Sequence, residues 1–225
     1  MTIDADKLLR LEVPEVEHAY SEKDAIVYAL GVGLGHDPMN EAELAFVYEK
    51  KLKVLPTFAC VLGYPAFWIR DLDTGVDWVK AVHGEQGLVL HRPIEPRGEV
   101  VGVTRVLDVI DKGPGKGALI YRLSGDWNPL HAEPRHAAAA GYPRPILHGL
   151  ATFGVAGHAI LKMACDYDPA RLIAMHGRFS APVYPGETIR TEIWRDGAQI
   201  SFRARVLERD VVAIASGRAG VRVSA

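Results

Sequence analysis

The stretch Ile-Leu-His-Gly-Leu-Ala-Thr-Phe-Gly-Val-Ala-Gly-His-Ala-Ile-Leu-Lys-Met-Ala-Cys, residues 146–165, is the longest apolar run of the chain. It is interrupted by His148, His158 and Lys162 and by several glycines. Because a helix that spans a membrane needs about 20 residues with few or no charges, a helix buried in a protein core is the better interpretation. We therefore predict one long buried helix over residues 147–165.

Segments with the character of β-strands follow this helix. In one of them Ser201, Arg203 and Arg205 alternate with apolar side chains, which is typical of a strand that faces a core on one side and water on the other. Asp196-Gly197 lies where a tight hairpin turn would be. One helix beside an antiparallel sheet predicts an α+β fold. The predicted strands cover residues 172–180, 188–195, 199–208 and 211–222, and a short helix is expected over 134–140.

The first half of the chain has a different set of signals. Ser21-Glu-Lys-Asp24 has the pattern of a capping box, with Asp24 in place of the usual glutamate, and predicts a helix through Leu30. Residues 41–51 are a second helical candidate, and the apolar residues 56–68 could also be helical. The period then changes to two, which predicts strands over 78–91 and 98–111. Residues 113–117, rich in glycine, are expected to form a turn.

A short motif occurs twice. Pro93-Ile-Glu-Pro-Arg-Gly-Glu99 matches Pro182-Val-Tyr-Pro-Gly-Glu187 with one residue inserted, and each copy lies between two strand candidates. Two copies of one unit, a helix with an antiparallel sheet, are the natural inference, and we place them at residues 1–117 and 118–225. There is room for three strands after the second motif but for fewer after the first. The first sheet is therefore expected to be short of strands and to have unpaired edges.

The bulk composition excludes several classes of protein. The chain has 225 residues, a formal net charge of -2 and 48% hydrophobic residues, so we expect neither a nucleic-acid partner nor a membrane partner. Its two cysteines, Cys60 and Cys165, lie in apolar runs and are expected to be buried, reduced thiols. No secretory leader and no C-terminal peroxisomal signal are recognised, so a cytoplasmic location is expected. We identify no metal-ligand motif.

The segment Ser-Gly-Asp-Trp-Asn-Pro-Leu-His, residues 124–131, brings a carboxylate, an amide and an imidazole into one tight turn. A carboxylate and a neutral imidazole that hold the same water can share a proton transfer, and Asn128 can orient that water. Asp-x-Asn-Pro is also ordinary turn chemistry, because Asp and Asn side chains bond nearby backbone amides. The addition of His131 favours the interpretation of Asp126, Asn128 and His131 as a catalytic group.

Gly149 opens the long helix directly after His148. The first amides of a helix are unpaired and point outward with a positive partial charge, and a glycine lets a ligand oxygen come close. Such an amide can form an oxyanion hole. The alternative is that Gly149 only permits close packing of the helix on the sheet and that His148 is a core histidine.

These residues resemble a known family. Tyr121-Arg-Leu-Ser-Gly-Asp-Trp-Asn-Pro-Leu-His131 and Pro145-Ile-Leu-His-Gly149 are similar to the signature of the R-specific enoyl-CoA hydratase 2 family, which are MaoC-like dehydratases. The likeness extends over nearly the whole chain, for example in Leu55-Pro-Thr-Phe58, Val82-His-Gly-Glu-Gln86 and Gly177-Arg-Phe-Ser-Ala-Pro182.

The resemblance implies a double hot dog fold, in which two antiparallel sheets are each wrapped on a central helix. It implies a first half that binds the acyl chain and CoA, a catalytic second half, and a homodimer. It implies reversible hydration of a trans-2-enoyl-CoA to a (3R)-3-hydroxyacyl-CoA, with no cofactor because CoA is part of the substrate. Asp126 and His131 would be the catalytic pair, supported by Asn128 and by the amide of Gly149. Contacts with the acyl-CoA are implied for His83, Gly84, Lys112, Phe179 and Glu49. For Glu49 the residues themselves favour the alternative of a solvated helix charge beside Lys50 and Lys51.

The chain departs from the family at one place. Members of the family have a few dozen residues between the Asp-Lys-Gly segment and Tyr-Arg-Leu-Ser-Gly, whereas here Ile120 is followed at once by Tyr121. This departure coincides with the strands that the repeat predicts to be missing. The short first half leaves open a module that binds acyl-CoA without catalysis. A second alternative is an acyl-CoA thioesterase on the same fold, against which the Asp-x-Asn-Pro-x-His turn argues.

Overall fold

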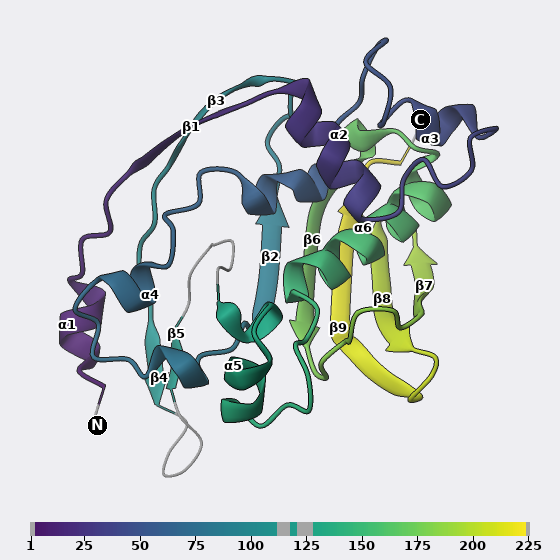
Figure 1. The fold of residues 1–225 in the computed structure, drawn as a ribbon. Coiled ribbons are helices and arrows are strands. Elements are labelled where there is room, and N and C mark those ends of the chain that lie inside the picture. The colour runs from purple at the N-terminus through teal and green to yellow at the C-terminus, as the bar shows by residue number, and fades with distance from the viewer. Residues whose placement is uncertain (1–2, 112–117, 121–127, 224–225) are drawn as a thin grey trace.

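The computed structural model describes residues 3–111, 118–120 and 128–223. Asp126, Lys112 and the turn predicted over 113–117 lie outside these residues. The second half of the chain forms a hot dog, in which helix α6 (Gly149–Cys165) lies along one face of an antiparallel sheet (Figure 1). The order of the strands in this sheet is β2-β6-β9-β8-β7. Their bounds are β2 (Glu85–Val89), β6 (Leu172–Phe179), β7 (Ile189–Asp196), β8 (Gln199–Val206) and β9 (Val211–Val221).

The elements predicted for this half are confirmed to within a few residues. Gly197 and Ala198 form the hairpin loop between β7 and β8, since Asp196 pairs with Gln199, and Gly197 has a positive φ of 57°. Along β8 the buried and more exposed side chains alternate, as predicted. Short helices precede α6 and β6: η3 (Pro129–His131), α5 (Pro134–Ala139) and η4 (Pro169–Arg171).

The first half forms short elements, some of which pack on α6 while others lie away from it (Figure 1). Helix α2 (Glu22–Gly31) begins at the predicted capping box, where Asp24 Oδ2 accepts hydrogen bonds from the Ser21 amide (2.8 Å) and hydroxyl (2.7 Å). β1 (Val16–Tyr20) pairs with β3 (Gly98–Gly102), and β4 (Val109–Asp111) pairs with β5 (Ala118–Ile120), as two separate ribbons. The remaining helices are α1 (Ala5–Leu9), α3 (Glu41–Leu44), η1 (Pro56–Val61), α4 (Trp68–Asp71) and η2 (Trp78–Lys80).

The first sheet is short of strands, as predicted. In the second half, the strand before the repeated motif (β6) and the strand after it (β7) are separated by β9 and β8. In the first half the corresponding strands are β2 and β3, and no described strand lies between them. β2 instead pairs with β6, its counterpart in the other repeat, with Glu85 opposite Arg178. Apolar side chains of β2, of β3 and of the segment after β3 are more than half exposed: Val89, Val101, Val103 and Leu107.

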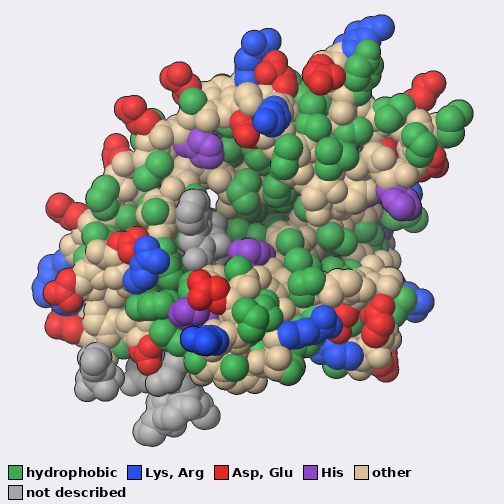
Figure 2. Space-filling model, in the orientation of Figure 1, with side chains coloured by type: hydrophobic (Ala, Val, Ile, Leu, Met, Phe, Trp, Pro, Cys, Tyr) green, Lys and Arg blue, Asp and Glu red, His purple; other side chains and the backbone are tan. Residues whose placement is uncertain are grey.

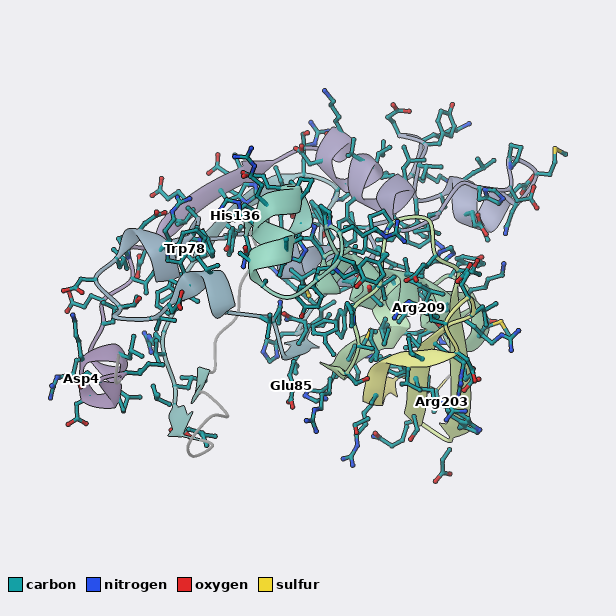
Figure 3. The ribbon with its side chains drawn as sticks, turned by 60° about the horizontal axis from the view of Figure 1, so that its bottom comes forward. Asp4, Trp78, Glu85, His136, Arg203 and Arg209 are labelled. Carbon is teal, nitrogen blue, oxygen red and sulfur yellow. The ribbon has the colours of Figure 1, made fainter. Side chains whose placement is uncertain are left out.

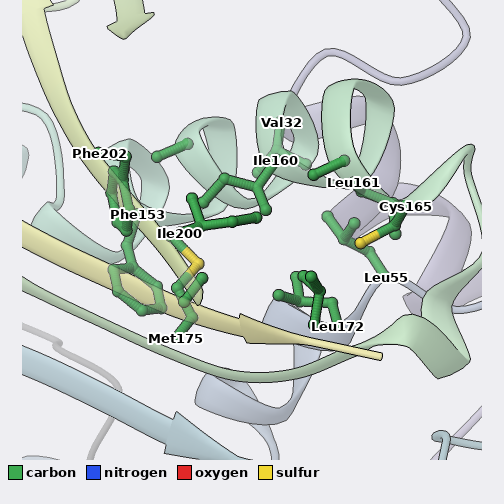
Figure 4. Close-up of a cluster of buried hydrophobic side chains, with 14 of the residues drawn as sticks. Val32, Leu55, Phe153, Ile160, Leu161, Cys165, Leu172, Met175, Ile200 and Phe202 are labelled. Carbon is green, nitrogen blue, oxygen red and sulfur yellow. The ribbon is translucent and has the colours of Figure 1, made fainter. Parts of the chain in front are cut away.

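The main core joins both halves of the chain around α6. Phe153, Ile160 and Leu161 of the helix pack against Leu172, Met175, Ile200 and Phe202 of the sheet, while Val32 and Leu55 close the core from the first half (Figure 4). The glycines of α6 permit this packing. A Cβ on Gly154 would lie 2.6 Å from a methyl carbon of Val32, and a Cβ on Gly157 would lie 2.6 Å from the methyl carbon of Thr57.

The helix predicted over 41–51 is wrong beyond Leu44. The carbonyl of Ala45, which a continuing helix would use for the amide of Glu49, accepts a hydrogen bond from the amide of Lys53 at 2.7 Å. Lys51 has a positive φ of 61°, which ends any helix there. The ammonium of Lys53 then donates to the carbonyl of Tyr167, so a tertiary contact decides the course of the chain.

The strands predicted over 78–91 and 98–111 are longer than the observed ones. Trp78 lies in the 3-10 helix η2, where its ring packs on Phe67 and His136, and strand β2 begins only at Glu85, where β6 provides a partner. β3 ends at Gly102 and β4 begins at Val109, with no pairing described between them. Within the described ranges, no helix combines the length and apolar character that crossing a membrane requires.

Candidate active site

Asn128 fixes the turn that leads to His131. It is 6% exposed and has the extended backbone predicted for a residue before proline, with φ -67° and ψ 125°. Its side-chain oxygen accepts a hydrogen bond from the amide of Leu130 at 3.0 Å, and its side-chain nitrogen donates to the carbonyl of Ala81 at 3.3 Å. The amide therefore joins the turn to the segment that contains His83.

The imidazole of His131 is held by a backbone carbonyl. Its Nδ1 lies 3.0 Å from the carbonyl oxygen of Ile146. A carbonyl oxygen can only accept, so we assign the proton of the neutral ring to Nδ1, and Nε2 then has a lone pair. This tautomer suits a ring that accepts a proton or binds a water hydrogen through Nε2.

The start of α6 lies beside this ring. His148 is the residue before the helix, and its ring stacks on that of His131 with 3.8 Å between the ring centroids and 29° between the planes. Gly149 is the first helical residue, so its N–H has no acceptor within the helix. The ring of Phe179 covers Gly149, because a Cβ there would lie 3.0 to 3.2 Å from three ring carbons.

Phe179 in turn connects Gly149 to the predicted CoA contacts. The amide of Phe179 donates to the carbonyl of Gly84 at 2.8 Å, and the ring of His83 meets the Phe179 ring edge to face with 5.2 Å between centroids. The structure therefore links all the predicted site residues that it describes, apart from Glu49. They come from four segments: residues 83–84, 128–131, 148–149 and 179.

The structure does not bring Glu49 to this group. The segment that contains it is attached to the C-terminal end of α6, where Glu43 accepts a hydrogen bond from Tyr167 and Lys53 donates to the Tyr167 carbonyl. Glu49 itself is exposed. Since α6 has 17 residues, its two ends are about 25 Å apart. Asp126 and Lys112 lie outside the described residues, so their roles stay predictions.

Helix α5 packs beside residues 128–131, which it follows in the chain. The ring of His136 stacks on Trp78 with 6.2 Å between centroids, and Nδ1 of His136 lies 2.9 Å from a carboxylate oxygen of Glu133. Figure 3 shows Trp78 and His136 together, on the side of the molecule away from Arg203 on the sheet. Residues 128–131 are thus held between this helix and the start of α6.

A cavity of about 640 Å³ opens from the site toward the first half of the chain. Most of its lining is apolar; it includes His148 and Ala151 at the start of α6, Tyr28 and Gly31 of α2, and His18 and Tyr64. Figure 2 shows the face of the molecule hollowed near its middle, with hydrophobic side chains inside. The sequence alone did not reveal this cavity, because its walls come from four distant segments; the one signal was the unusual run Tyr28-Ala-Leu-Gly-Val-Gly33.

Burial keeps both cysteine thiols protonated, although Cys60 is half-buried and only Cys165 is as buried as expected. This burial raises the pKa of the Cys60 thiol to about 12 and that of the Cys165 thiol to about 11, so neither forms a thiolate near neutral pH. Burial also raises the pKa of Tyr28, whose hydroxyl stays protonated in the cavity wall. No group of three or more His, Cys, Asp or Glu side chains placed to hold a metal ion occurs among the residues that the structure describes.

Comparison with protein families gives two matches that together cover most of the chain. Residues 18–124 match the MFE-2 hydratase 2 N-terminal domain, and residues 104–216 match the MaoC like domain. Among solved structures, a MaoC-like dehydratase from Phytophthora capsici is similar, with a TM-score of 0.77, 28% identity and 98% of each chain covered. The full-length peroxisomal multifunctional enzyme type 2 of Drosophila melanogaster is similar over 92% of this chain and 48% of that one, with a TM-score of 0.75 and 29% identity.

Proteins of similar sequence have names that agree with these two family matches. The peroxisomal enoyl-CoA hydratase 2 of Arabidopsis thaliana is 30% identical, with 94% of this chain and 93% of that protein covered. The 3-hydroxyacyl-thioester dehydratase Y of Mycobacterium tuberculosis is 32% identical, with 93% of this chain and 94% of that protein covered. The alignment with the Arabidopsis protein spans 293 positions, more than the 225 residues of this chain, so that relative has residues without a counterpart here.

Proposed function

Because the chain belongs to the family of MaoC-like dehydratases that carry the hydratase 2 N-terminal domain, we propose that it catalyses the reversible hydration of trans-2-enoyl-CoA to (3R)-3-hydroxyacyl-CoA in fatty acyl-CoA metabolism. The proposed mechanism rests on one structural observation. Residues 146–149 hold His131 by its Nδ1 and also present the N–H of Gly149, so one short segment positions both the base and the oxyanion donor.

In the proposed reaction a water bound between Asp126 and His131 adds to C3 of the enoyl group. The water oxygen forms the new C–O bond, one of its protons leaves to this pair, and C2 receives a proton, so that one water is added in total. Negative charge gathers on the thioester oxygen as the bond forms. The Gly149 amide donates to that oxygen and stabilises the charge where it develops, which accelerates the step.

The acyl chain is proposed to occupy the 640 Å³ cavity. Its lining is mostly apolar and begins at His148, beside His131, which is where the carbons beyond C3 would leave the site. Tyr28 and Gly31 of α2 form part of the far wall. The CoA portion is proposed to contact His83, Gly84, Phe179 and Lys112, with the Lys112 ammonium near the phosphates; Glu49 stays a predicted contact.

Several further expectations belong to this proposal. Hydration involves no net oxidation or reduction, and the residues above supply proton transfer and charge stabilisation, so we propose that no cofactor is needed. We also propose a homodimer in the cytoplasm, which analytical ultracentrifugation and cell fractionation would test; the relatives from Arabidopsis thaliana and Drosophila melanogaster described above have peroxisomal names.

The decisive experiment is an assay of the purified chain with crotonyl-CoA and a longer trans-2-enoyl-CoA. Hydration is expected to remove the enoyl absorbance and to give the 3R product on chiral analysis. Release of free CoA instead would identify a thioesterase. Binding of acyl-CoA with no turnover would identify a binding module and would contradict the proposed function.

A further inference from the structure

We propose that His148 is a positioning residue for His131, and that it acts through the flat face of its ring. The inference rests on the proposed function, in which His131 exchanges a proton with water and substrate. The two rings are 3.8 Å apart between centroids and tilted by 29°, which is the geometry of an aromatic stack. The role of His148 would therefore be to fix the ring that performs the proton transfer.

Among the described residues, two contacts from one segment constrain how the His131 ring lies. The carbonyl of Ile146 accepts from Nδ1 at 3.0 Å, which fixes one corner of the ring. A hydrogen bond at one corner does not by itself define the plane of the ring, since the second torsion of a histidine side chain has a broad energy profile. The stacked ring of His148 removes this freedom, so Nε2 points in one direction.

His148 is itself anchored by the start of α6. Its carbonyl accepts hydrogen bonds from the amides of Ala151 (3.1 Å) and Thr152 (3.3 Å), which begin the helix. The preceding amide, of Leu147, donates to the carbonyl of Val183 at 2.7 Å and ties the segment to the neighbouring loop. The His148 ring therefore keeps a fixed place relative to the N–H of Gly149. Because the His131 ring stacks on it, the orientation of the His131 ring is restricted as well.

The stack has a second consequence for the reaction. When Nε2 takes up a proton, His131 becomes a cation, and a flat aromatic ring against its face attracts that charge. Phenylalanine at position 148 would keep both the stacking and the attraction to the cation. Leucine, which has a similar volume but no flat ring, would keep neither.

The test compares His148→Phe with His148→Leu in the hydration of crotonyl-CoA, whose short acyl group leaves most of the cavity empty. We expect His148→Leu to lower kcat by about 10- to 100-fold with KM and melting temperature nearly unchanged, since small misplacements of a catalytic group have effects of this size. We expect His148→Phe to keep kcat within about threefold of the original chain. Equal losses in both variants, or no loss in either, would overturn the proposal.

A second measurement does not depend on turnover. The ring protons of His131, assigned by their loss in His131→Gln, are expected to be shifted by the ring current of residue 148. The shift should persist in His148→Phe and vanish in His148→Leu. If the unaltered chain fails to hydrate any enoyl-CoA, the proposed function is wrong, but this measurement still decides whether His148 orders the ring; identical His131 signals in all three proteins would show that it does not.

Discussion

The ring of Phe179, from the end of β6, occupies the space that a side chain on Gly149 would need. A Cβ at position 149 would lie 3.0 to 3.2 Å from three of its ring carbons, closer than ordinary van der Waals contact. The backbone of Gly149 is helical, so alanine there is not strained in itself. A side chain at position 149 would therefore meet this ring, and the ring or residue 149 would have to move by a few tenths of an ångström.

Gly149→Ala is expected to lower kcat for crotonyl-CoA by about tenfold, because the Phe179 ring and the 149 amide must move apart by a few tenths of an ångström. The melting temperature should not fall, since alanine favours a helix. Gly31→Ala is the matched control, because nothing lies within 4 Å of a Cβ there. A Gly149→Ala protein with unchanged kcat would show that this packing does not affect the reaction.

Asp126→Asn and His131→Ala are each expected to lower kcat by about 10²- to 10⁴-fold, the usual contribution of a general acid or base. Circular dichroism and thermal unfolding should stay close to those of the original chain. The control is His176→Ala, which changes an exposed histidine on the outer face of the sheet. A variant that retains full turnover would remove that residue from the mechanism.

Gly31→Phe is expected to shift the preference toward short acyl groups. Gly31 lines the 640 Å³ cavity and has open space around it, so a phenyl ring would enter the cavity. If two methylenes of the acyl chain lose their burial, transition-state binding weakens by about 1.6 kcal/mol, and kcat/KM for a hexadecenoyl-CoA falls by roughly 15-fold. In Gly31→Phe, kcat/KM for crotonyl-CoA should stay nearly the same. In the control Gly31→Ala, kcat/KM should stay nearly the same for both crotonyl-CoA and hexadecenoyl-CoA. An equal loss for short and long substrates would place the acyl chain elsewhere.

The free energy of unfolding is expected to fall as the pH decreases from about 7.5 to 5.5, in part through His158. Burial lowers the pKa of His158 below its ordinary value of 6.5, and its Nε2 is buried without a hydrogen-bond partner among the described residues. The unfolded chain therefore binds the proton more readily than the folded one. The contribution of neutral His158 to the free energy of unfolding is fully present above the pKa that this histidine has in the unfolded chain. It is lost as the pH falls through the lower pKa that the histidine has in the folded chain.

Urea unfolding at several pH values measures this effect. The decrease should be smaller in His158→Gln than in the original chain. His36→Gln, which alters an exposed histidine, should keep the original slope. Parallel pH profiles in all three proteins would contradict the assignment to His158.

The sequence by itself determined the second half of the fold and, within the described residues, the extended Asn128 that leads into residues 129–131 of the site. The long apolar helix, the four strands after it and the two-residue hairpin loop all follow from periodicity and turn chemistry within a few neighbouring residues. The capping box at Ser21 and the extended backbone of Asn128 are equally local, because each depends on one residue and its next few partners. The repeat also revealed that the first sheet is short of strands.

Only the tertiary structure decided which of these elements meet. Helix α3 ends at Leu44 because the Ala45 carbonyl bonds to Lys53, and β2 begins at Glu85 because β6 is its partner there. The stack of His148 on His131 and the cavity behind it join segments that are distant along the chain. Local patterns record which conformation a segment favours, whereas pairing, stacking and cavities depend on packing between segments, which no short stretch of sequence contains.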